Sequence, residues 1–175
     1  MTRHVVGVYA VAALGLAMLP GGAVAQQKSL KEQIVGAWSV VSWEQTLPDG
    51  TKLQRFGANP KGINVFDANG RVFVMFVRPD LPRLASNNLS TPTPEEAKAI
   101  VGGSIAYYGT YTVDEAAKTV SLRLDATTFQ NQLGMEQKRN IVSLTADELK
   151  YSNPTPTTGG QITVGLKRLP AGATN

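Results

Sequence analysis

Hydrophobic residues recur at every second position along most of the chain after residue 36. Between residues 104 and 113, for example, Ile105, Tyr107, Tyr111 and Val113 fall on the same side of the segment. This alternation is typical of a β-strand with one buried face. It predicts about nine short strands, over residues 37–47, 51–56, 62–67, 71–78, 104–113, 119–125, 135–144, 148–152 and 161–168.

Turn and helix signals separate these strands. Pro48-Asp49-Gly50 and Asp67-Ala68-Asn69-Gly70 are typical of tight turns between antiparallel strands. A capping box of Ser29 and Glu32 predicts a short helix before the first strand. A second short helix begins after Thr93 and ends at Gly102-Gly103. It follows an irregular insert, residues 79–94, which contains four prolines and therefore cannot form a regular strand.

The order of these elements predicts an all-β fold. Short turns between consecutive strands give an antiparallel meander. A meander of this length protects its edges best by closing into an up-and-down β-barrel. A two-layer sandwich is the structural alternative. The sequence shows no internal repeat and no sign of a second domain.

The first residues have the three-part order of an export signal. Arg3 and His4 precede the uncharged apolar run from Val5 to Leu19, and Ala23-Val24-Ala25 provides small residues for cleavage. Such a run is too short for a membrane-spanning helix and is typical of a signal peptide. We therefore expect a signal peptide at 1–25, cleavage near Ala25 and export to the periplasm or the medium. We also expect a single domain at 26–175, with no membrane span after cleavage.

The net charge and the absence of some residue types limit the kinds of site that this chain can form. The chain has no cysteine and one histidine, His4, which the expected cleavage removes. Disulfides, His- or Cys-based zinc sites and Ser-His-Asp triads are therefore excluded from residues 26–175. Removal of Arg3 leaves 17 − 1 = 16 basic against 13 acidic residues. This small, scattered excess does not indicate a nucleic-acid surface, and we expect no metal and no cofactor.

Two ends of the predicted barrel domain carry a known signature. Gly36-Ala37-Trp38 stands where the first helix meets the first strand, and Arg168 ends the last strand. This arrangement resembles the Gly-x-Trp motif of lipocalins, in which a late arginine packs over the tryptophan at the barrel floor. The resemblance implies structural roles for Gly36, Trp38 and Arg168, with a cation–π contact between the last two.

A larger, ordered set of segments resembles the bacterial and fungal lipocalin-like domain family, a calycin-type barrel. These segments run from about residue 34 to 168 and comprise 36–42, 56–62, 67–70, 78–83, 107–114 and Arg139. Members often carry a histidine in the strand that matches 120–124, where this chain has Ser121-Leu122-Arg123, and an aromatic residue near Leu166. The resemblance implies a lipocalin-like barrel with a cavity and does not imply one activity.

Candidate cavity residues follow from the parity of each strand. If Trp38 points inward, the same parity carries Ser42 and Glu44 inward, unless a bulge near Val40-Val41 switches it. The other interpretation places Glu44 in solvent. A buried Glu44 would be the only weak candidate for a catalytic carboxylate.

Four other strand positions and one charged residue complete the candidate ligand-binding set. In 71–78, the inward-facing residues are either Phe73 and Met75 or the set Val72, Val74 and Phe76. The flexible side chain of Met75 would suit a pocket wall that adapts to its ligand. Tyr107 and Tyr111 share a face and would either orient a ligand or serve as core tyrosines. Arg139 would either bind a ligand carboxylate or form a surface salt bridge.

The sequence is compatible with three functions. The leading hypothesis is an exported protein that binds a small apolar ligand, either neutral or acidic, in its barrel. The first alternative is a cyclase or isomerase with an acid–base set of Glu44 and either Tyr107 or Arg139. The second is a protein-interaction module that uses the Pro-rich insert. The sequence favours a non-enzymatic role and leaves ligand identity and oligomeric state open.

Overall fold

The structure is a computed structural model that describes residue 1, residues 28–170 and residue 172. The expected signal peptide, 1–25, lies outside the described residues except for Met1. No helix within the described ranges is both long and apolar enough to cross a membrane. The elements are α1 (Leu30–Ile34), β1 (Gly36–Thr46), β2 (Lys52–Leu53), β3 (Lys61–Phe66), β4 (Arg71–Val77), α2 (Pro94–Gly103), β5 (Ser104–Asp114), β6 (Thr119–Thr127), the 3-10 turn η1 (Gln130–Gln132), β7 (Glu136–Leu144), β8 (Glu148–Asn153) and β9 (Gln161–Arg168).

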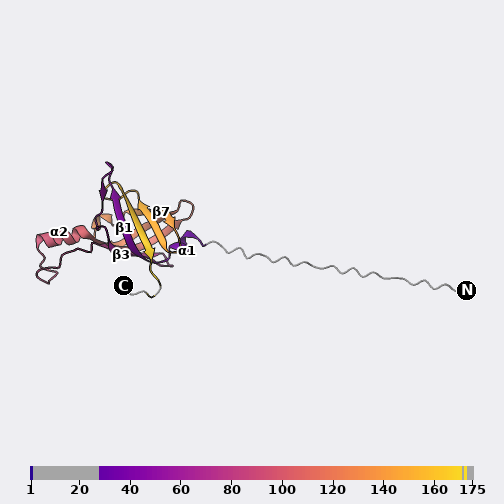
Figure 1. The fold of residues 1–175 in the computed structure, drawn as a ribbon, viewed down its shortest axis with the longest axis horizontal. Coiled ribbons are helices and arrows are strands. Elements are labelled where there is room, and N and C mark those ends of the chain that lie inside the picture. The colour runs from indigo at the N-terminus through magenta and orange to yellow at the C-terminus, as the bar shows by residue number, and fades with distance from the viewer. Residues whose placement is uncertain (2–27, 171, 173–175) are drawn as a thin grey trace.

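Eight of the strands close into a barrel (Figure 1). The sheet order is β2-β1-β3-β4-β5-β6-β7-β8-β9, and β1 also pairs with β9. All neighbours are antiparallel, so the predicted all-β up-and-down barrel is confirmed and the two-layer sandwich is wrong. The strand expected at 51–56 is shorter in the structure, where only β2 pairs with β1. Phe56 lies beyond the end of β2 and is buried.

The two ends of the barrel differ in the length of their connections. Short turns at 67–70, 115–118 and 145–147 join strands at the end where β1 begins. The longer connections at 47–60, 78–103, 128–135 and 154–160 all lie at the other end. We call the first end the floor and the second the mouth. Because long loops tolerate varied side chains, the mouth is where a binding site is expected.

A β-bulge in β1 decides which of its side chains face the interior. The pairing of β1 with β9 shifts register between Val40 and Ser42. Trp38 is buried before the bulge and Trp43 is buried after it, although their positions differ by an odd number (43 − 38 = 5). The extra residue reverses the parity, so the expected inward placement of Ser42 and Glu44 is wrong.

Strand β4 is apolar on both faces, and its register decides which face is the core. Val72, Val74 and Phe76 are buried inside the barrel. Phe73 and Met75 lie on the outer surface with 39% and 40% of their area exposed. The expected placement of Phe73 and Met75 in a pocket is therefore wrong.

The floor is closed by the predicted contact between Arg168 and Trp38. The guanidinium carbon of Arg168 lies 3.9 Å from the centre of the Trp38 ring, which is fully buried. Arg168 also donates to the carbonyls of Val35 (2.9 Å) and Gln33 (2.7 Å). The indole of Trp38 donates to the carbonyl of Ile34 (2.8 Å). Arg168 thereby joins β9 to the segment that immediately precedes β1.

Gly36 is required where this contact forms. Its φ of +133° is a backbone conformation that residues with a side chain rarely adopt. A Cβ atom at this position would lie 2.7 Å from Nη1 of Arg168. The glycine thus leaves room for the guanidinium that covers Trp38.

Replacement of Arg168 by methionine should destabilise the barrel. Arg168→Met removes the cation–π contact and leaves backbone carbonyls without their donor, and we expect a loss of about 3 kcal/mol in the free energy of unfolding. Urea denaturation followed by tryptophan fluorescence measures this change. Lys167→Met, at the exposed neighbouring position, is the matched control and should stay near the parent value. Equal losses in both variants would contradict a specific role for Arg168.

Candidate functional site

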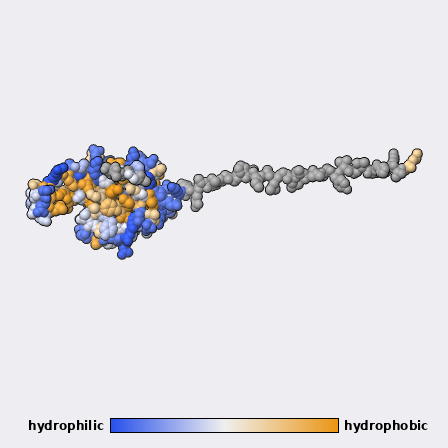
Figure 2. Space-filling model, turned by 90° about the horizontal axis from the view of Figure 1, so that it is seen from below, coloured by the Kyte–Doolittle hydropathy of each residue, from blue (hydrophilic) through white to orange (hydrophobic). Residues whose placement is uncertain are grey.

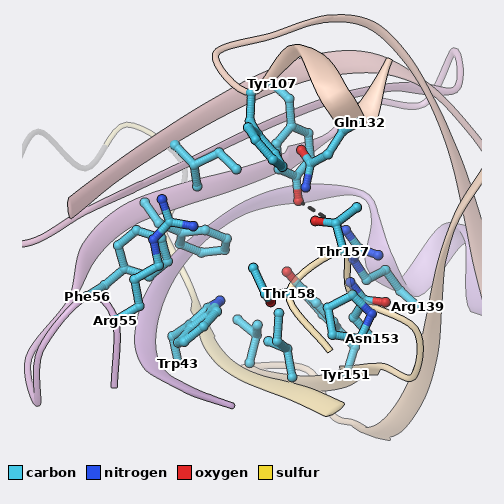
Figure 3. A pocket seen from close by; sticks show the side chains of 16 residues that line it. Trp43, Arg55, Phe56, Tyr107, Gln132, Arg139, Tyr151, Asn153, Thr157 and Thr158 are labelled. Atoms are coloured by element: carbon cyan, nitrogen blue, oxygen red, sulfur yellow. Dashed lines mark hydrogen bonds between the residues drawn. The ribbon is translucent and has the colours of Figure 1, made fainter. Parts of the chain in front are cut away.

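A small pocket opens at the mouth of the barrel (Figure 3). Its cavity volume is about 60 Å³. We call it the mouth pocket. Its lining is half apolar and half polar, and consists of Trp43, Arg55, Phe56, Phe76, Ile105, Tyr107, Phe129, Gln132, Arg139, Tyr151, Asn153, Pro156, Thr157, Thr158, Ile162 and Val164.

Aromatic rings form one wall of the mouth pocket. Trp43 meets Phe56 edge to face with ring centres 5.1 Å apart. Phe56 in turn lies 5.6 Å from Phe76 in a tilted arrangement. Phe56 is 1% exposed, so its ring is packed between its neighbours at the mouth. Such a wall provides apolar contact area for the body of a ligand.

Gln45 fixes the loop that bounds the pocket on another side. The bulge in β1 turns Gln45 inward, where it is buried. Its amide nitrogen donates to the hydroxyl of Thr158 (2.9 Å) and to the carbonyl of Gly159 (2.6 Å). The connection between β8 and β9 is thus held by a side chain from β1. The threonines that line the mouth pocket are therefore in defined positions.

Arg139 is the buried charge of the mouth pocket. Its side chain extends from β7 into the barrel, and the residue is 6% exposed. Nη1 donates to the carbonyl of Lys138 (2.9 Å), and Nη2 donates to the hydroxyl of Tyr107 (3.4 Å). The guanidinium carbon lies 5.9 Å from the centre of the Tyr151 ring. None of the ion pairs among the described residues involves Arg139.

Tyr151 links Arg139 to a polar group deeper in the barrel. The amide nitrogen of Asn64 donates to the hydroxyl of Tyr151 (2.9 Å). Burial raises the pKa of Tyr151 well above its usual range, so this phenol stays neutral. Burial acts to lower the pKa of Arg139, but the hydroxyls of Tyr107 and Tyr151 act to raise it, and the net direction is upward. Arg139 therefore keeps its charge.

The mouth pocket has a net positive lining. It contains two arginines and no aspartate or glutamate. A buried charge is costly unless a group of opposite sign pairs with it. The described residues also contain no group of three or more His, Cys, Asp or Glu side chains that could hold a metal ion. The arrangement is suited to holding an anion.

The structure brings two of the predicted site residues into the mouth pocket. Tyr107 and Arg139 both line it, from β5 and β7, and their side chains are hydrogen-bonded. Tyr111 also points inward, but nearer the floor. Its hydroxyl donates to the carbonyl of Asp67 (2.6 Å), and its ring packs against Phe66. Tyr111 is therefore a core tyrosine bonded to backbone.

Glu44 does not reach the pocket. Its carboxylate lies on the outer face of β1 and pairs with Lys52 at 2.9 Å. Ser42 is exposed at the bulge. The acid–base set expected for a cyclase or isomerase therefore loses its carboxylate. The mouth pocket offers hydroxyls, amides and guanidinium groups for binding but no carboxylate general base.

The sequence pattern did not indicate that several other residues line the mouth pocket. Trp43 was hidden by the bulge, and Phe76 by the apolar character of both faces of β4. Arg55 and Phe56 belong to a segment expected to be a strand. Tyr151 falls within a correctly predicted strand, and its inward parity relative to Leu149 was the available signal.

The Pro-rich insert does not cover the mouth pocket. The insert and α2 project to one side of the barrel (Figure 1). Figure 2 shows this lobe with apolar surface on the side that faces the barrel. Leu89 and Val101 are 88% and 72% exposed, as a protein-interaction surface requires. That function stays a prediction.

The sequence of this barrel matches a known family. A model of the lipocalin-like domain matches residues 35–164, most of the chain. The chain belongs to the lipocalin-like domain family. A search of the curated proteins found none that matches this lipocalin-like protein.

Among solved structures, the lipocalin-like protein is similar to designed barrels. A redesigned β-barrel is 15% identical, with a TM-score of 0.43, and the match covers 81% of this chain and 96% of that one. A de novo designed fluorescence-activating β-barrel is 10% identical, with a TM-score of 0.42, over 82% and 100% of the two chains. A redesigned β-barrel bound to DFHBI is 14% identical, with a TM-score of 0.42, over 81% and 100%.

Removal of the Arg139 charge should stabilise the unliganded protein. Arg139→Met keeps most of the side-chain volume and removes a buried charge without an acidic partner, so we expect the free energy of unfolding to rise by about 1 kcal/mol. Urea denaturation measures this rise. Arg123→Met, at an exposed position on the neighbouring strand β6, should have no effect. A loss of stability in Arg139→Met would show that the guanidinium serves the fold.

Proposed function

We propose that this lipocalin-like protein binds a small apolar acid in the mouth pocket, with the carboxylate of the ligand on Arg139. The observation that carries the proposal is a buried guanidinium in a cavity whose lining has no acidic residue. A ligand carboxylate would supply the missing negative charge. Arginine and carboxylate groups form paired, charge-assisted hydrogen bonds.

The neighbours of Arg139 favour an anion over a neutral ligand. Its guanidinium has five N–H donors and bonds the carbonyl of Lys138 and the hydroxyls of Tyr107 and Tyr151. Two donors (5 − 3 = 2) remain for a ligand. The hydroxyls of Tyr107 and Tyr151 stand beside them and can donate to the same ligand oxygens. Both tyrosines lie beside the guanidinium of Arg139.

The other walls determine the remainder of the ligand. Trp43, Phe56 and Phe76 present apolar area to the cavity. A pocket of this kind holds an apolar body and orients it with a few polar groups. The cavity of about 60 Å³ is far below the roughly 300–1,000 Å³ of sites for drug-sized ligands. The ligand is therefore compact. Because a cavity that encloses benzene measures about 150 Å³, a ligand with one aromatic ring would place its carboxylate inside and leave part of the ring in the open mouth.

We also propose that the protein is exported. The support comes from the sequence of residues 1–25, in which a basic start, an uncharged apolar run and small residues at Ala23 and Ala25 follow in order. N-terminal sequencing of the protein recovered from its own host tests this proposal. Native mass spectrometry of the same sample tests for a co-purifying small acid.

Benzoate and benzamide are matched probes for the proposed site. We expect benzoate to bind more tightly than benzamide, which has the same shape and no charge. Arg139→Gln should weaken benzoate binding by at least about tenfold, since a hydrogen bond to a charged group is lost. Isothermal titration calorimetry measures both, with Arg123→Gln as the control for net charge. Equal affinity for the two probes, or no effect of Arg139→Gln, would overturn the proposal.

The pH dependence of benzoate binding should follow the ligand. Neither Arg139 nor Tyr151 changes charge near neutrality, because both have raised pKa values. Affinity should therefore be flat from about pH 6 to about pH 9. It should fall as pH drops below about 4, where a carboxyl group takes up a proton and loses its charge. Calorimetry at several pH values measures the profile, and a loss between pH 7 and 9 would contradict it.

A further inference from the structure

The mouth pocket has a second cationic group, Arg55, that the proposed function leaves unused. Arg55 lies in the connection between β2 and β3, next to Phe56, and it lines the same cavity as Arg139. Its guanidinium carbon lies 5.3 Å from the centre of the Phe56 ring. Its Nε donates to the carbonyl of Gly102 (2.7 Å), and its Nη2 donates to the carbonyl of Val101 (3.0 Å).

These two bonds account for only part of the bonding capacity of Arg55. They hold the C-terminal end of α2, whose last turn has no basic residue of its own. A guanidinium has five N–H donors, so three (5 − 2 = 3) remain without a partner among the described residues. One part of the side chain serves the fold, and the rest remains for a ligand.

No carboxylate neutralises either arginine. The ion pairs of the described residues involve neither Arg55 nor Arg139. The lining of the mouth pocket contains no acidic side chain. Burial lowers the pKa of Arg55, as expected for a partly desolvated cation without a counter-charge. Two positive groups therefore share one cavity that has no negative group.

The two guanidinium groups are separated across the pocket. Figure 3 shows Arg55 on one side of it, near Phe56 and Trp43, and Arg139 on the opposite side. A ligand with one anionic group at each end of an apolar body can pair with both.

We propose that the ligand is a compact dianion, with one anionic group on Arg139 and the second on Arg55. This inference rests on the proposed function and names the class of ligand more narrowly. The apolar body between the two groups lies against Trp43 and Phe56. A monoanion leaves one guanidinium without a counter-charge, whereas a dianion pairs with both.

A series of aromatic acids tests this inference. Benzoate has one carboxylate, and phthalate, isophthalate and terephthalate carry a second at increasing separation. We expect at least one of the three dicarboxylates to bind the purified protein about tenfold or more tightly than benzoate, by isothermal titration calorimetry. The isomer that binds best also reports the separation of the two guanidinium groups.

Two substitutions at Arg55 separate ligand binding from support of α2. Arg55→Gln should weaken the best dicarboxylate about tenfold more than it weakens benzoate, because only the dicarboxylate places a group on Arg55. Arg55→Lys should retain part of the advantage, because it keeps the charge. Arg123→Gln is the control for the same change in net charge at an exposed site. Circular dichroism and the Tm of each variant report whether α2 and the barrel remain folded.

Each outcome decides between the two proposals. If benzoate binding depends on Arg139 and no dicarboxylate binds more tightly, the dianion is wrong and the proposed function stands. If Arg55→Gln weakens benzoate and the dicarboxylates by the same factor, Arg55 only supports α2, and the dianion is again wrong. If none of the four acids binds, the proposed function fails and the dianion fails with it.

Discussion

The pairing of β1 with β9 is the constraint on which the rest of this molecule depends. These two strands are the first and last of the barrel, and their hydrogen bonds remove the free edges that an open meander would expose. Arg168 reinforces the closure, since it covers Trp38 and bonds carbonyls on the segment before β1. The interior exists only because the sheet returns to its own beginning. The mouth pocket is the part of that interior that side chains leave unfilled.

Closure also places the packed floor and the proposed binding site at opposite ends of the barrel. At the floor, short turns bring neighbouring strands together and Trp38 fills the space between them. At the mouth, long connections contribute Phe56, Phe129 and the threonines of the β8–β9 loop to the lining. Arg139 lies toward this end with no acidic partner. A buried charge of this kind is expected to reduce the stability of the unliganded barrel and to favour a ligand of opposite charge. This is a common trade-off between stability and function.

The sequence predicted correctly which side chains face the interior where strand parity was undisturbed. Tyr107 and Arg139 lie on regular stretches of β5 and β7, and both were identified as candidates. Glu44 was misplaced because a single extra residue in β1 reverses every position after it. Phe73 and Met75 were misplaced because alternation cannot distinguish two apolar faces. Arg55 could not be found from pattern, since its place in the pocket depends on contacts with the distant helix α2.

Resemblance to lipocalins implied the pair of Trp38 with Arg168, whereas the sequence by itself determined the all-β barrel, the capping boxes of both helices and the tight turns. These features follow from local chemistry and from the period-two pattern, which are written in neighbouring residues. Tertiary structure alone decided which face of β4 is buried, where β1 bulges and how two arginines come to share one cavity. Those outcomes depend on register between strands and on contacts between residues far apart in the chain. No local pattern encodes them.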